Sequence, residues 1–468
     1  MAPPSHCHTI NGGAPRNGAI PEVETTTSTP AASDTALLLD ADEFRRLGHQ
    51  VVDFIADYYA GLGDYPVHPS VTPGFLRRQL PADAPSRPEP EAFAAALRDV
   101  RDLILPGVTH WQTTRHFAHF PASSSTVGAL GEALAAGINV VPFTWAASPA
   151  ATELEMVVVD WLGRALHLPE SLLFAGGGGG TILGTSCEAV LCALVAARDR
   201  KLAEIGARRI GDLVVYCSDQ THFAFRKAAR IAGIPREHCR EIPTCRDDVF
   251  ALSPTALHAA MQADVDAGLV PLFLCATVGT TQTTAVDPVR ELCAVAARHG
   301  GEYILRDAAA EGHDVVDYKD WGTTLTRRFR ALKVWLVLRC YGVEGLRSHV
   351  RSHVAMAAAF EAMVRGDARF EVVAPRRFAL VCFRLRSPPE RLGVGVGVGG
   401  EKAANELNRR LLEEVNAASS GPYMSSAMVG GVYMLRCAIG STLTEERHVR
   451  EAWKVVQERA TSILRKRG

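Results

Sequence analysis

The sequence predicts an α/β fold in which a mostly parallel sheet is flanked by helices and followed by a smaller α+β domain. Between about residues 124 and 300, segments with helical periodicity alternate with short apolar runs such as Leu213–Cys217 and Leu272–Val278. This alternation is typical of a parallel sheet that helices cover on both faces. The chain has 468 residues, 47% hydrophobic and 22% charged, a composition typical of a soluble globular protein with roughly two or three domains.

Composition also excludes several classes of protein. A formal net charge of −1 argues against an electrostatic affinity for nucleic acid or anionic membranes. No apolar run approaches the ~18 residues of a membrane-spanning helix, and the N-terminus lacks the pattern of a secretory signal. The 11 cysteines form no C-x-x-C pair, which indicates reduced thiols and a cytoplasmic protein. We expect no bound metal, since His6, Cys7 and His8 lie in a tail without a preorganised site.

The first 123 residues divide into a tail and a helical arm. Residues 1 to 33 are rich in Pro, Gly, Asn, Thr and Ser, and are expected to be disordered because they cannot bury enough apolar area. Over residues 34 to 123 we expect a helix at Asp40–Tyr59, a proline-rich connector and a second helix near Glu91–Ile104. Two helices on a long connector make a poor independent domain, so this arm is expected to lie against a partner and form a homodimer.

A large domain is expected over residues 124 to 345 and a small α+β domain over residues 346 to 468. The helices expected in the large domain are Thr126–Ala136, Thr152–Leu166, Glu188–Leu202, Phe225–Ile231, Pro254–Ala267 and Pro288–His299. The elements expected in the small domain are a helix over Leu346–Arg365, strands over Leu380–Leu385 and Val432–Arg436, and a closing helix over about Glu445–Leu464. The run Gly393–Gly400 is expected to be a flexible loop.

The segment Ala175–Ala189 is the first candidate for ligand binding. Five consecutive glycines let the backbone approach a ligand closely, and Thr185 and Glu188 have the spacing of a capping box before an apolar helix. Hydroxyls and free N–H groups at a helix N-terminus suit a phosphate. A glycine hinge followed by an ordinary helix cap explains the same residues equally well. A dinucleotide-binding fold is excluded, because no strand with a downstream acidic residue frames the glycines.

Two further candidates follow predicted strands, where α/β sheets bind ligands. Asp219-Gln-Thr-His222 comes directly after the strand that ends at Cys217, and Thr277-Val-Gly-Thr-Thr281 ends the next strand. A satisfied loop histidine is the more common interpretation of His222 taken alone, and a plain exit from a strand explains the second segment equally well. Aromatic rings beside small polar residues in the segments 117–125 and 142–149 fit the wall of an aromatic pocket or the corner of a core equally well.

Taken in order, these segments resemble the pyridoxal-phosphate-dependent aromatic amino acid decarboxylases, particularly the plant tyrosine/tryptophan type. The motifs that carry the resemblance are His116-Phe-Ala-His-Phe-Pro, Phe143-Thr-Trp-Ala-Ala-Ser-Pro, Gly184-Thr-Ser-Cys-Glu-Ala, Ala276-Thr-Val-Gly-Thr-Thr, Val316-Asp-Tyr-Lys-Asp-Trp, Arg327-Arg-Phe-Arg-Ala-Leu-Lys, Tyr433-Met-Leu-Arg and Thr442-Leu-Thr-Glu-Glu-Arg-His. They span about residues 36 to 465. The resemblance implies the type I pyridoxal-phosphate fold, a homodimer, and conversion of L-tyrosine, L-tryptophan or L-dopa to the amine and CO2.

The resemblance also implies which residues meet the cofactor, pyridoxal 5'-phosphate. His222 matches the histidine that stacks on the cofactor ring. Ser186 and Cys187 match the phosphate-binding turn, and Thr281 matches another cofactor contact. In this chemistry the cofactor is the electron sink, and the protein supplies orientation and a proton.

Three residues match the substrate side of the family's site. Pro121 and Ala122 match the edge of the substrate pocket. Tyr318 matches the tyrosine on a mobile loop that protonates the substrate carbon after CO2 leaves. Phenylalanine at this position is associated with aldehyde-forming relatives, so Tyr318 favours plain decarboxylation.

The chain departs from the family in two residues. The Schiff-base lysine follows an Asn-Pro-His or Asn-Ala-His segment that is absent here, and no lysine of this chain takes its place. The aspartate that pairs with the pyridine nitrogen has one apparent counterpart, Asp307. We interpret Glu302–Arg306 as a later family segment, so a block is missing between Gly300 and Gly301, and Asp307 taking over the role is the less favoured interpretation.

This departure has consequences for both fold and activity. A missing block leaves the sheet of the large domain incomplete and exposes an apolar edge. Without the lysine the cofactor is not retained covalently, so catalysis by this chain is expected to be impaired. A second hypothesis is a non-catalytic chain that dimerises with a full-length decarboxylase. A third is an aromatic acetaldehyde synthase, which Tyr318 disfavours.

Overall fold

The computed structural model describes residues 40–86, 91–121, 124–300, 316–386, 398–418 and 421–466. Its α-helices are α1 (Ala41–Ala60), α2 (Ala92–Asp99), α3 (Thr126–Ile138), α4 (Pro149–Ala165), α5 (Ser186–Ile205), α6 (Ala224–Ile231), α7 (Pro254–Asp266), α8 (Val289–Arg298), α9 (Arg330–Arg365), α10 (Val398–Asn416) and α11 (Glu446–Arg465). Its strands are β1 (His116–Phe117), β2 (Leu213–Ser218), β3 (Cys239–Ile242), β4 (Val270–Cys275), β5 (Phe370–Val372), β6 (Leu380–Leu385), β7 (Tyr423–Val429) and β8 (Val432–Ala438). The predicted tail and Asp307 lie outside the described residues.

The two helices predicted in the N-terminal arm are confirmed. The chain divides into two compact units, one ending at Ala60 and one beginning at Gly61, so α1 is described by itself. The Asp40 carboxylate accepts a hydrogen bond from the backbone N–H of Glu43 (2.7 Å), which satisfies one donor at the start of α1. In the second unit, α2 continues as a π-helical turn to Ile104.

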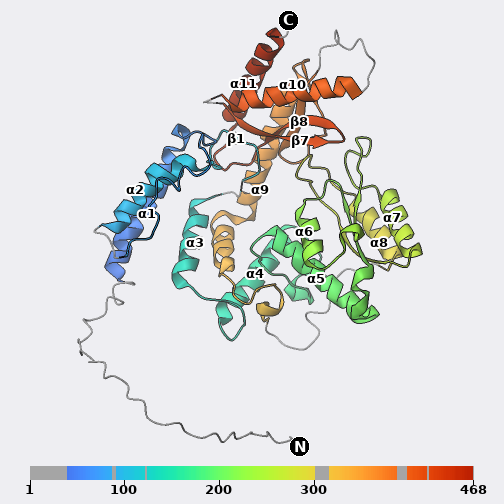
Figure 1. Cartoon of the computed structure of the whole chain (residues 1–468). Helices are drawn as coiled ribbons and strands as arrows, with labels where there is room; N and C mark the ends of the chain where they lie inside the picture. The colour runs from blue at the N-terminus through green and yellow to red at the C-terminus, as the bar shows by residue number, and fades with distance from the viewer. Residues whose placement is uncertain are drawn as a thin grey trace, which may run out of the picture. The chain divides into compact units, whose positions relative to one another are not determined.

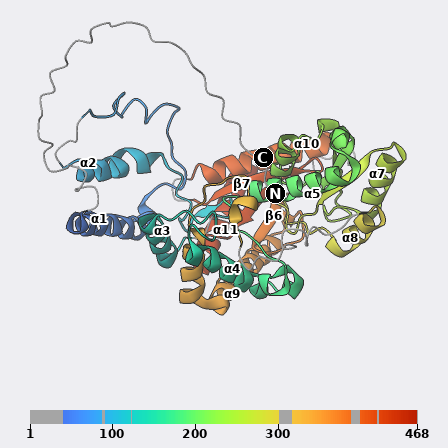
Figure 2. The same cartoon turned by 90° about the horizontal axis from the view of Figure 1, so that it is seen from below.

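A three-stranded parallel sheet in the order β3-β2-β4 lies in the region that is predicted as the large domain, which the structure groups with the predicted small domain in one compact unit, Gly61–Gly468. All six residues of β2 are buried. Val215 and Cys217 pack with α5 and α6 on one face, whereas Val214 and Tyr216 pack with α7 and α8 on the other. The pairing of α5 with α6 can be followed in Figure 1, and that of α7 with α8 in Figures 1 and 2. Helices therefore cover both faces of the sheet, as the alternation in the sequence predicts.

Strand β4 is paired along one edge only. It lies next to β2, and in the described part of the chain no strand pairs with its other edge. None of its six residues is buried, in contrast to β2. A groove with a volume of about 400 Å³ follows this edge between α5 and α8. An edge strand at this place agrees with the expected incomplete sheet.

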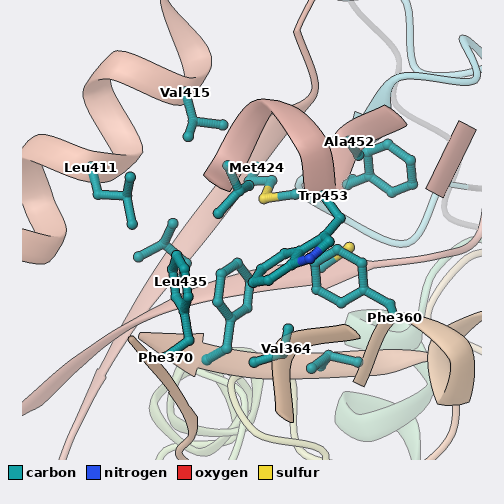
Figure 3. Packing of buried hydrophobic residues seen from close by; sticks show 14 of the residues in the cluster. Phe360, Val364, Phe370, Leu411, Val415, Met424, Leu435, Ala452 and Trp453 are labelled. Atoms are coloured by element: carbon teal, nitrogen blue, oxygen red, sulfur yellow. The ribbon is translucent and has the colours of Figure 1, made fainter. Parts of the chain in front are cut away.

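The small domain contains a five-stranded sheet in the order β1-β7-β8-β6-β5, antiparallel except for the parallel pair β1 and β7. The second half of α9 packs with α10 and α11 on one face. Trp453 of α11 lies at the centre of this core, with its ring edge-to-face against Phe360 and Phe370 at centroid distances of 5.5 and 4.9 Å (Figure 3). The opposite face packs against Phe250 and Ala285, which belong to loops of the large domain.

Two boundaries differ from the sequence prediction. The residues His116 and Phe117 were expected to belong to the arm, but they pair with β7 and so extend the sheet of the small domain. Helix α9 begins at Arg330, well before the predicted Leu346, and has a kink at Gly342, where φ is +66°. The predicted helix is the part of α9 after this kink, because a glycine in a left-handed conformation interrupts the helical pattern.

No helix in the described ranges is long and apolar enough to cross a membrane.

The aromatic core of the small domain generates a stability prediction. Trp453 is 5% exposed, and Trp453→Ala would leave a cavity among the phenylalanine rings. We expect a loss of about 3–5 kcal/mol in the free energy of unfolding, measured by urea denaturation. Lys454→Ala, at an exposed position of the same helix, is the control and should change stability little. Equal stability of the two variants would contradict this account of the core.

Strand β1 generates a pH prediction. His116 is fully buried, neither ring nitrogen has a hydrogen-bond partner, and burial lowers its pKa from 6.5 to about 4. Between these two values the unfolded chain binds the proton and the folded chain does not, so stability falls as the pH falls through this window. His116→Phe should remove up to about 3 kcal/mol of this acid sensitivity. Denaturation at neutral and mildly acidic pH measures the effect, with the exposed His49→Phe as control; an unchanged pH profile in His116→Phe would refute it.

Candidate active site

The carboxyl ends of β2, β3 and β4 meet at one edge of the parallel sheet, and two of the candidate residues, His222 and Thr281, lie in the loops that follow β2 and β4. Asp219, which follows β2, accepts hydrogen bonds from the backbone N–H (3.2 Å) and hydroxyl (2.8 Å) of Thr244, which follows β3. Asp287 accepts hydrogen bonds from the backbone N–H groups of Leu252 (2.8 Å) and Thr277 (2.7 Å), and so fixes the loop after β4. Both carboxylates are therefore engaged in holding the loops of this edge together.

His222 lies at this edge with its side chain exposed. Its Nδ1 accepts a hydrogen bond from the backbone N–H of Ala224 (3.3 Å), and its ring lies 4.6 Å from the ring of Phe223. An acceptor role for Nδ1 places the proton of the neutral imidazole on Nε2. The His222 ring is exposed at this edge. Its predicted role, stacking on the cofactor ring, stays a prediction.

One half of the capping box predicted before α5 is present, and the other half is replaced by a bond to the residue before the N-cap. The Thr185 hydroxyl accepts the backbone N–H of Glu188 (3.1 Å), and the Glu188 carboxylate accepts the backbone N–H of Gly184 (2.7 Å). Ser186 and Cys187 are exposed in the first turn, where their N–H groups, hydroxyl and thiol can meet an anion. A cavity of about 600 Å³ opens beside this turn, lined by Glu188, by α3 and by residues of the segment 322–330.

Four of the five glycines in the run before α5 pack closely against protein, and the fifth, Gly177, faces open space. A Cβ atom at Gly176 would lie 2.0 Å from the carbonyl oxygen of Glu170, and one at Gly180 would lie 2.7 Å from a methyl group of Val159. These glycines let the loop lie tightly on its neighbours. The close contacts give most of the run a packing role, and the helix N-terminus after it remains the predicted ligand site.

Tyr318 was expected on a mobile loop, but the structure buries its side chain completely in a turn of 3-10 helix, Tyr318–Asp320. Its hydroxyl donates to the carbonyl oxygen of Gly180 (3.4 Å), and the guanidinium of Arg327 lies 4.4 Å from the ring centroid. Burial, together with the negative charge of Glu155, raises the pKa of Tyr318. In this arrangement the hydroxyl is a neutral donor that faces the protein, and the loop would have to open before it reached a substrate.

A buried ion pair holds this region together. Arg327 donates to the Glu155 carboxylate (2.6 Å), with 5% and 1% of the two side chains exposed. Glu155 also accepts the backbone N–H of Ile182 (2.8 Å), and Arg327 also donates to the hydroxyl of Thr181 (2.8 Å). The pair thus joins α4, the end of the glycine-rich loop and the segment that carries Tyr318.

Arg436 of β8 connects the segment before Pro121 with the loop after β4. The sequence did not predict this connecting role. It donates to the carbonyl oxygens of Thr281 (2.6 Å) and Gln282 (3.0 Å) and to the hydroxyl of Ser425 (2.8 Å). Ser425 in turn donates to the carbonyl oxygen of Ala118 (2.5 Å). Burial lowers the pKa of this guanidinium, since its partners are neutral. The motif Tyr433-Met-Leu-Arg was the one signal in the sequence that pointed to it.

The predicted substrate residues are only partly visible. Pro121 is buried, and a Cβ atom at Gly440 would lie 3.2 Å from its ring. Ala122 lies outside the described residues. Just before them, the ring of Trp111 stacks on His116 and His119 at centroid distances of 5.1 and 5.2 Å. The rings of this segment therefore pack partly against one another. His119, which is close to Pro121 in the sequence, remains exposed.

The residues present do not fit a covalently held pyridoxal phosphate, which requires a lysine and a charged partner for the pyridine nitrogen. All seven lysines of the chain lie in described segments, and none is buried. Lys201, Lys319 and Lys333 form ion pairs with carboxylates, and no hydrogen bond or ion pair joins any lysine to Ser186, Cys187, His222 or Thr281. Ser186 and Cys187, which are predicted to meet the phosphate, are exposed, but no lysine is placed to attach the cofactor. Among the residues described, no cluster of three or more metal-ligating side chains forms.

The ion pair at Tyr318 generates a stability prediction. Glu155→Gln would leave the buried Arg327 charge without a counter-charge, and we expect a loss of about 3–5 kcal/mol in the free energy of unfolding. Glu153→Gln, at an exposed position of the same helix, should cost less than about 1 kcal/mol. Chemical denaturation of both variants measures the difference, and equal stabilities would show that the pair does not hold the region.

Comparison with known proteins places the chain. The sequence profile of the "Pyridoxal-dependent decarboxylase conserved domain" matches residues 73–315 and 304–386. A tyrosine decarboxylase of Oryza sativa subsp. japonica is 87% identical over 533 aligned positions, which cover 100% of both chains. The crystal structures of Catharanthus roseus tryptophan decarboxylase in complex with L-tryptophan (41% identity, TM-score 0.85) and Rhodiola rosea 4-hydroxyphenylacetaldehyde synthase (43%, TM-score 0.84) each align with 91% of this chain and 99% of their own. The α/β fold and these matches agree: the chain belongs to the pyridoxal-dependent decarboxylase family of carboxy-lyases, whose cofactor is pyridoxal phosphate.

Proposed function

We propose that this chain is a subunit of an aromatic L-amino acid decarboxylase, and that it turns over little or none of its substrate by itself. The family's reaction on tyrosine, tryptophan or dopa releases CO2 and leaves the amine. The names of two relatives, a tyrosine decarboxylase and a tryptophan decarboxylase, support this substrate class. The proposed loss of activity is based on one observation: no lysine forms a hydrogen bond or an ion pair with Ser186 or His222.

The comparisons support a missing block as the cause. The alignment with the rice tyrosine decarboxylase runs over 533 positions and this chain has 468 residues, a difference of 65, so at least that many positions of the relative have no residue here. The family profile matches in two stretches that meet between residues 304 and 315. We place the missing block at the junction of Gly300 and Gly301, which follows α8 and the open edge of β4.

Four residues remain as proposed contacts to the cofactor. Ser186 and Cys187, at the N-terminus of α5, have free donors for its phosphate, and His222 offers an exposed ring to its plane. Thr281 is exposed on the loop that Arg436 holds. With the phosphate end alone, binding is non-covalent, and the chemistry that the cofactor supplies, an electron sink, is not coupled to an attached lysine.

The proposed loss of activity predicts a specific assay result. The purified chain, incubated with pyridoxal phosphate and L-tyrosine, L-tryptophan or L-dopa, should form no amine above a catalytically dead control, because no lysine attaches the cofactor. Borohydride reduction followed by mass spectrometry should find no cofactor bound to a lysine. The rice tyrosine decarboxylase, treated in parallel, is the positive control. Amine formation, or a reduced adduct on any lysine of this chain, would overturn the proposal.

The transcript tests the missing block directly. Sequencing the native message across the codons for residues 298–304 distinguishes two cases. Additional sequence that encodes a lysine after an Asn-Ala-His or similar segment means that the complete product is a working decarboxylase. A message that joins Gly300 directly to Gly301 means that the shortened chain exists as a protein.

We also propose that the chain is a cytoplasmic homodimer. Helix α3 supports an interface, since Leu130, Leu134 and Ile138 follow one stripe of its surface with 50, 50 and 55% of their surface exposed. The non-catalytic alternative uses the same surfaces to pair with a full-length relative. Co-expression with such a relative should then yield mixed dimers, and an exclusively homodimeric relative would count against it.

The aldehyde synthase alternative rests on relatives that carry that name, the Rhodiola enzyme among them. Tyr318 argues against it by the association of phenylalanine at this position with aldehyde formation. Analysis of the products of a complete chain for aldehyde, ammonia and peroxide, rather than amine alone, distinguishes the two.

A further inference from the structure

The groove beside β4 adjoins the point at which we place the departure of this chain from the rice tyrosine decarboxylase. Its floor is the free edge of β4, whose residues Val-Pro-Leu-Phe-Leu-Cys are all uncharged, so no charge discourages a further strand. Gly300, the last residue before the proposed gap, lines the same groove. None of the roles described above uses this surface.

The helices beside the groove offer apolar walls to both faces of an incoming strand. Ala193 and Ala197 of α5 line one side, and Leu292 and Cys293 of α8 line the other. Helix α5 packs on one face of the sheet and α8 on the opposite face. Successive side chains of a strand point to opposite faces, so a strand that extends this sheet turns one set toward α5 and the other toward α8. The occupant that fits is a strand that is apolar on both faces, as in buried parallel sheets.

The charged residues that line the groove are Arg200, Lys201 and Glu204, all on α5. Arg200 and Lys201 lie 3.8 and 2.6 Å from the carboxylate of the same Glu204, so this rim has one positive charge in excess. A second copy of this chain brings the same excess charge, and its own β4 is recessed between the same helices. The groove therefore favours a segment that presents a free strand.

We propose that this groove is the docking site of the segment that the rice tyrosine decarboxylase has and this chain lacks, and that it accepts this segment from a separate polypeptide. The inference rests on the proposed gap after Gly300. At least 65 positions of the relative have no residue here, which is enough for several strands of ordinary length. A segment that continues from Gly300 starts in the wall of the groove, beside the free edge of β4. Its pairing satisfies the N–H and C=O groups on that edge.

Hydrogen exchange of the full chain tests this docking. The probe is the fragment of the rice tyrosine decarboxylase that has no counterpart in this chain, expressed as a separate polypeptide. The readout is exchange at the amides of Val270 and Leu272–Cys275, since Pro271 has none. With the fragment at about ten times its dissociation constant, exchange at these amides should slow about tenfold, because the bound edge opens less often.

A matched pair of variants on α8 locates the binding. Ala297 lines the groove and Ala294 does not, and both are exposed. Ala297→Trp places a large ring at the mouth of the groove and should abolish the slowing, whereas Ala294→Trp should preserve it. Equal slowing in the two variants would overturn the inference, as would unchanged exchange of β4 in the wild-type chain with the fragment. Protection of β4 that grows with the concentration of the chain alone would also overturn it, because a second copy then occupies the groove.

A hybrid chain gives a second measurement that does not depend on the solubility of the free fragment. In the hybrid the same segment is inserted between Gly300 and Gly301, and the β4 amides should be protected relative to this chain. Exchange of these amides at the rate of this chain would refute the docking site. Amine formation by this chain without the fragment refutes the proposed loss of activity instead, so the two failures are distinguishable.

Discussion

A strand at the edge of a sheet leaves the N–H and C=O groups of one side without a strand partner, and among the described residues β4 is paired with β2 alone. Strand β2, with β3 on one side and β4 on the other, is buried at all six residues, whereas no residue of β4 is. The difference follows from pairing and not from composition, since both strands are apolar. The groove beside β4, the missing lysine and the interrupted family match all concern the chain that follows α8. The proposed gap after α8 therefore accounts both for the unpaired edge of β4 and for the missing lysine.

The rest of the site is held in place by buried polar groups that reach far along the chain. The Arg327–Glu155 pair joins α4, the glycine-rich loop and the segment of Tyr318. Arg436 connects the small domain with the loop that carries Thr281, and Ser425 continues this connection to the segment before Pro121. These networks lie within the described residues and join segments on both sides of the Gly300–Gly301 junction, so they hold the segments proposed for the substrate and the phosphate without the block that we propose is missing.

Several elements could be read from the sequence because their signals are local. Thr185 and Glu188 predicted the start of α5, and the apolar runs predicted β2 and β4. Strand β3 was missed because its four residues include a charged pair, Arg240 and Glu241, and give no apolar run. Helix α10 was missed because the glycine-valine run before it obscured its beginning. Strand β1, with two residues, has no pattern that a sequence could reveal.

The sequence by itself determined the family, the helix caps, and the absence of a lysine for the cofactor, since each depends on residue types at short spacing. The tertiary structure alone decided that Tyr318 faces the carbonyl oxygen of Gly180, that most of the glycine run serves packing, and that Arg436 links two domains. These features depend on contacts between residues more than a hundred positions apart, or on the shape of the neighbouring backbone, and no local pattern encodes them. The open edge of β4 also depends on the tertiary structure. A strand is an edge strand when no other strand pairs with one of its sides, and in the described residues this holds for β4.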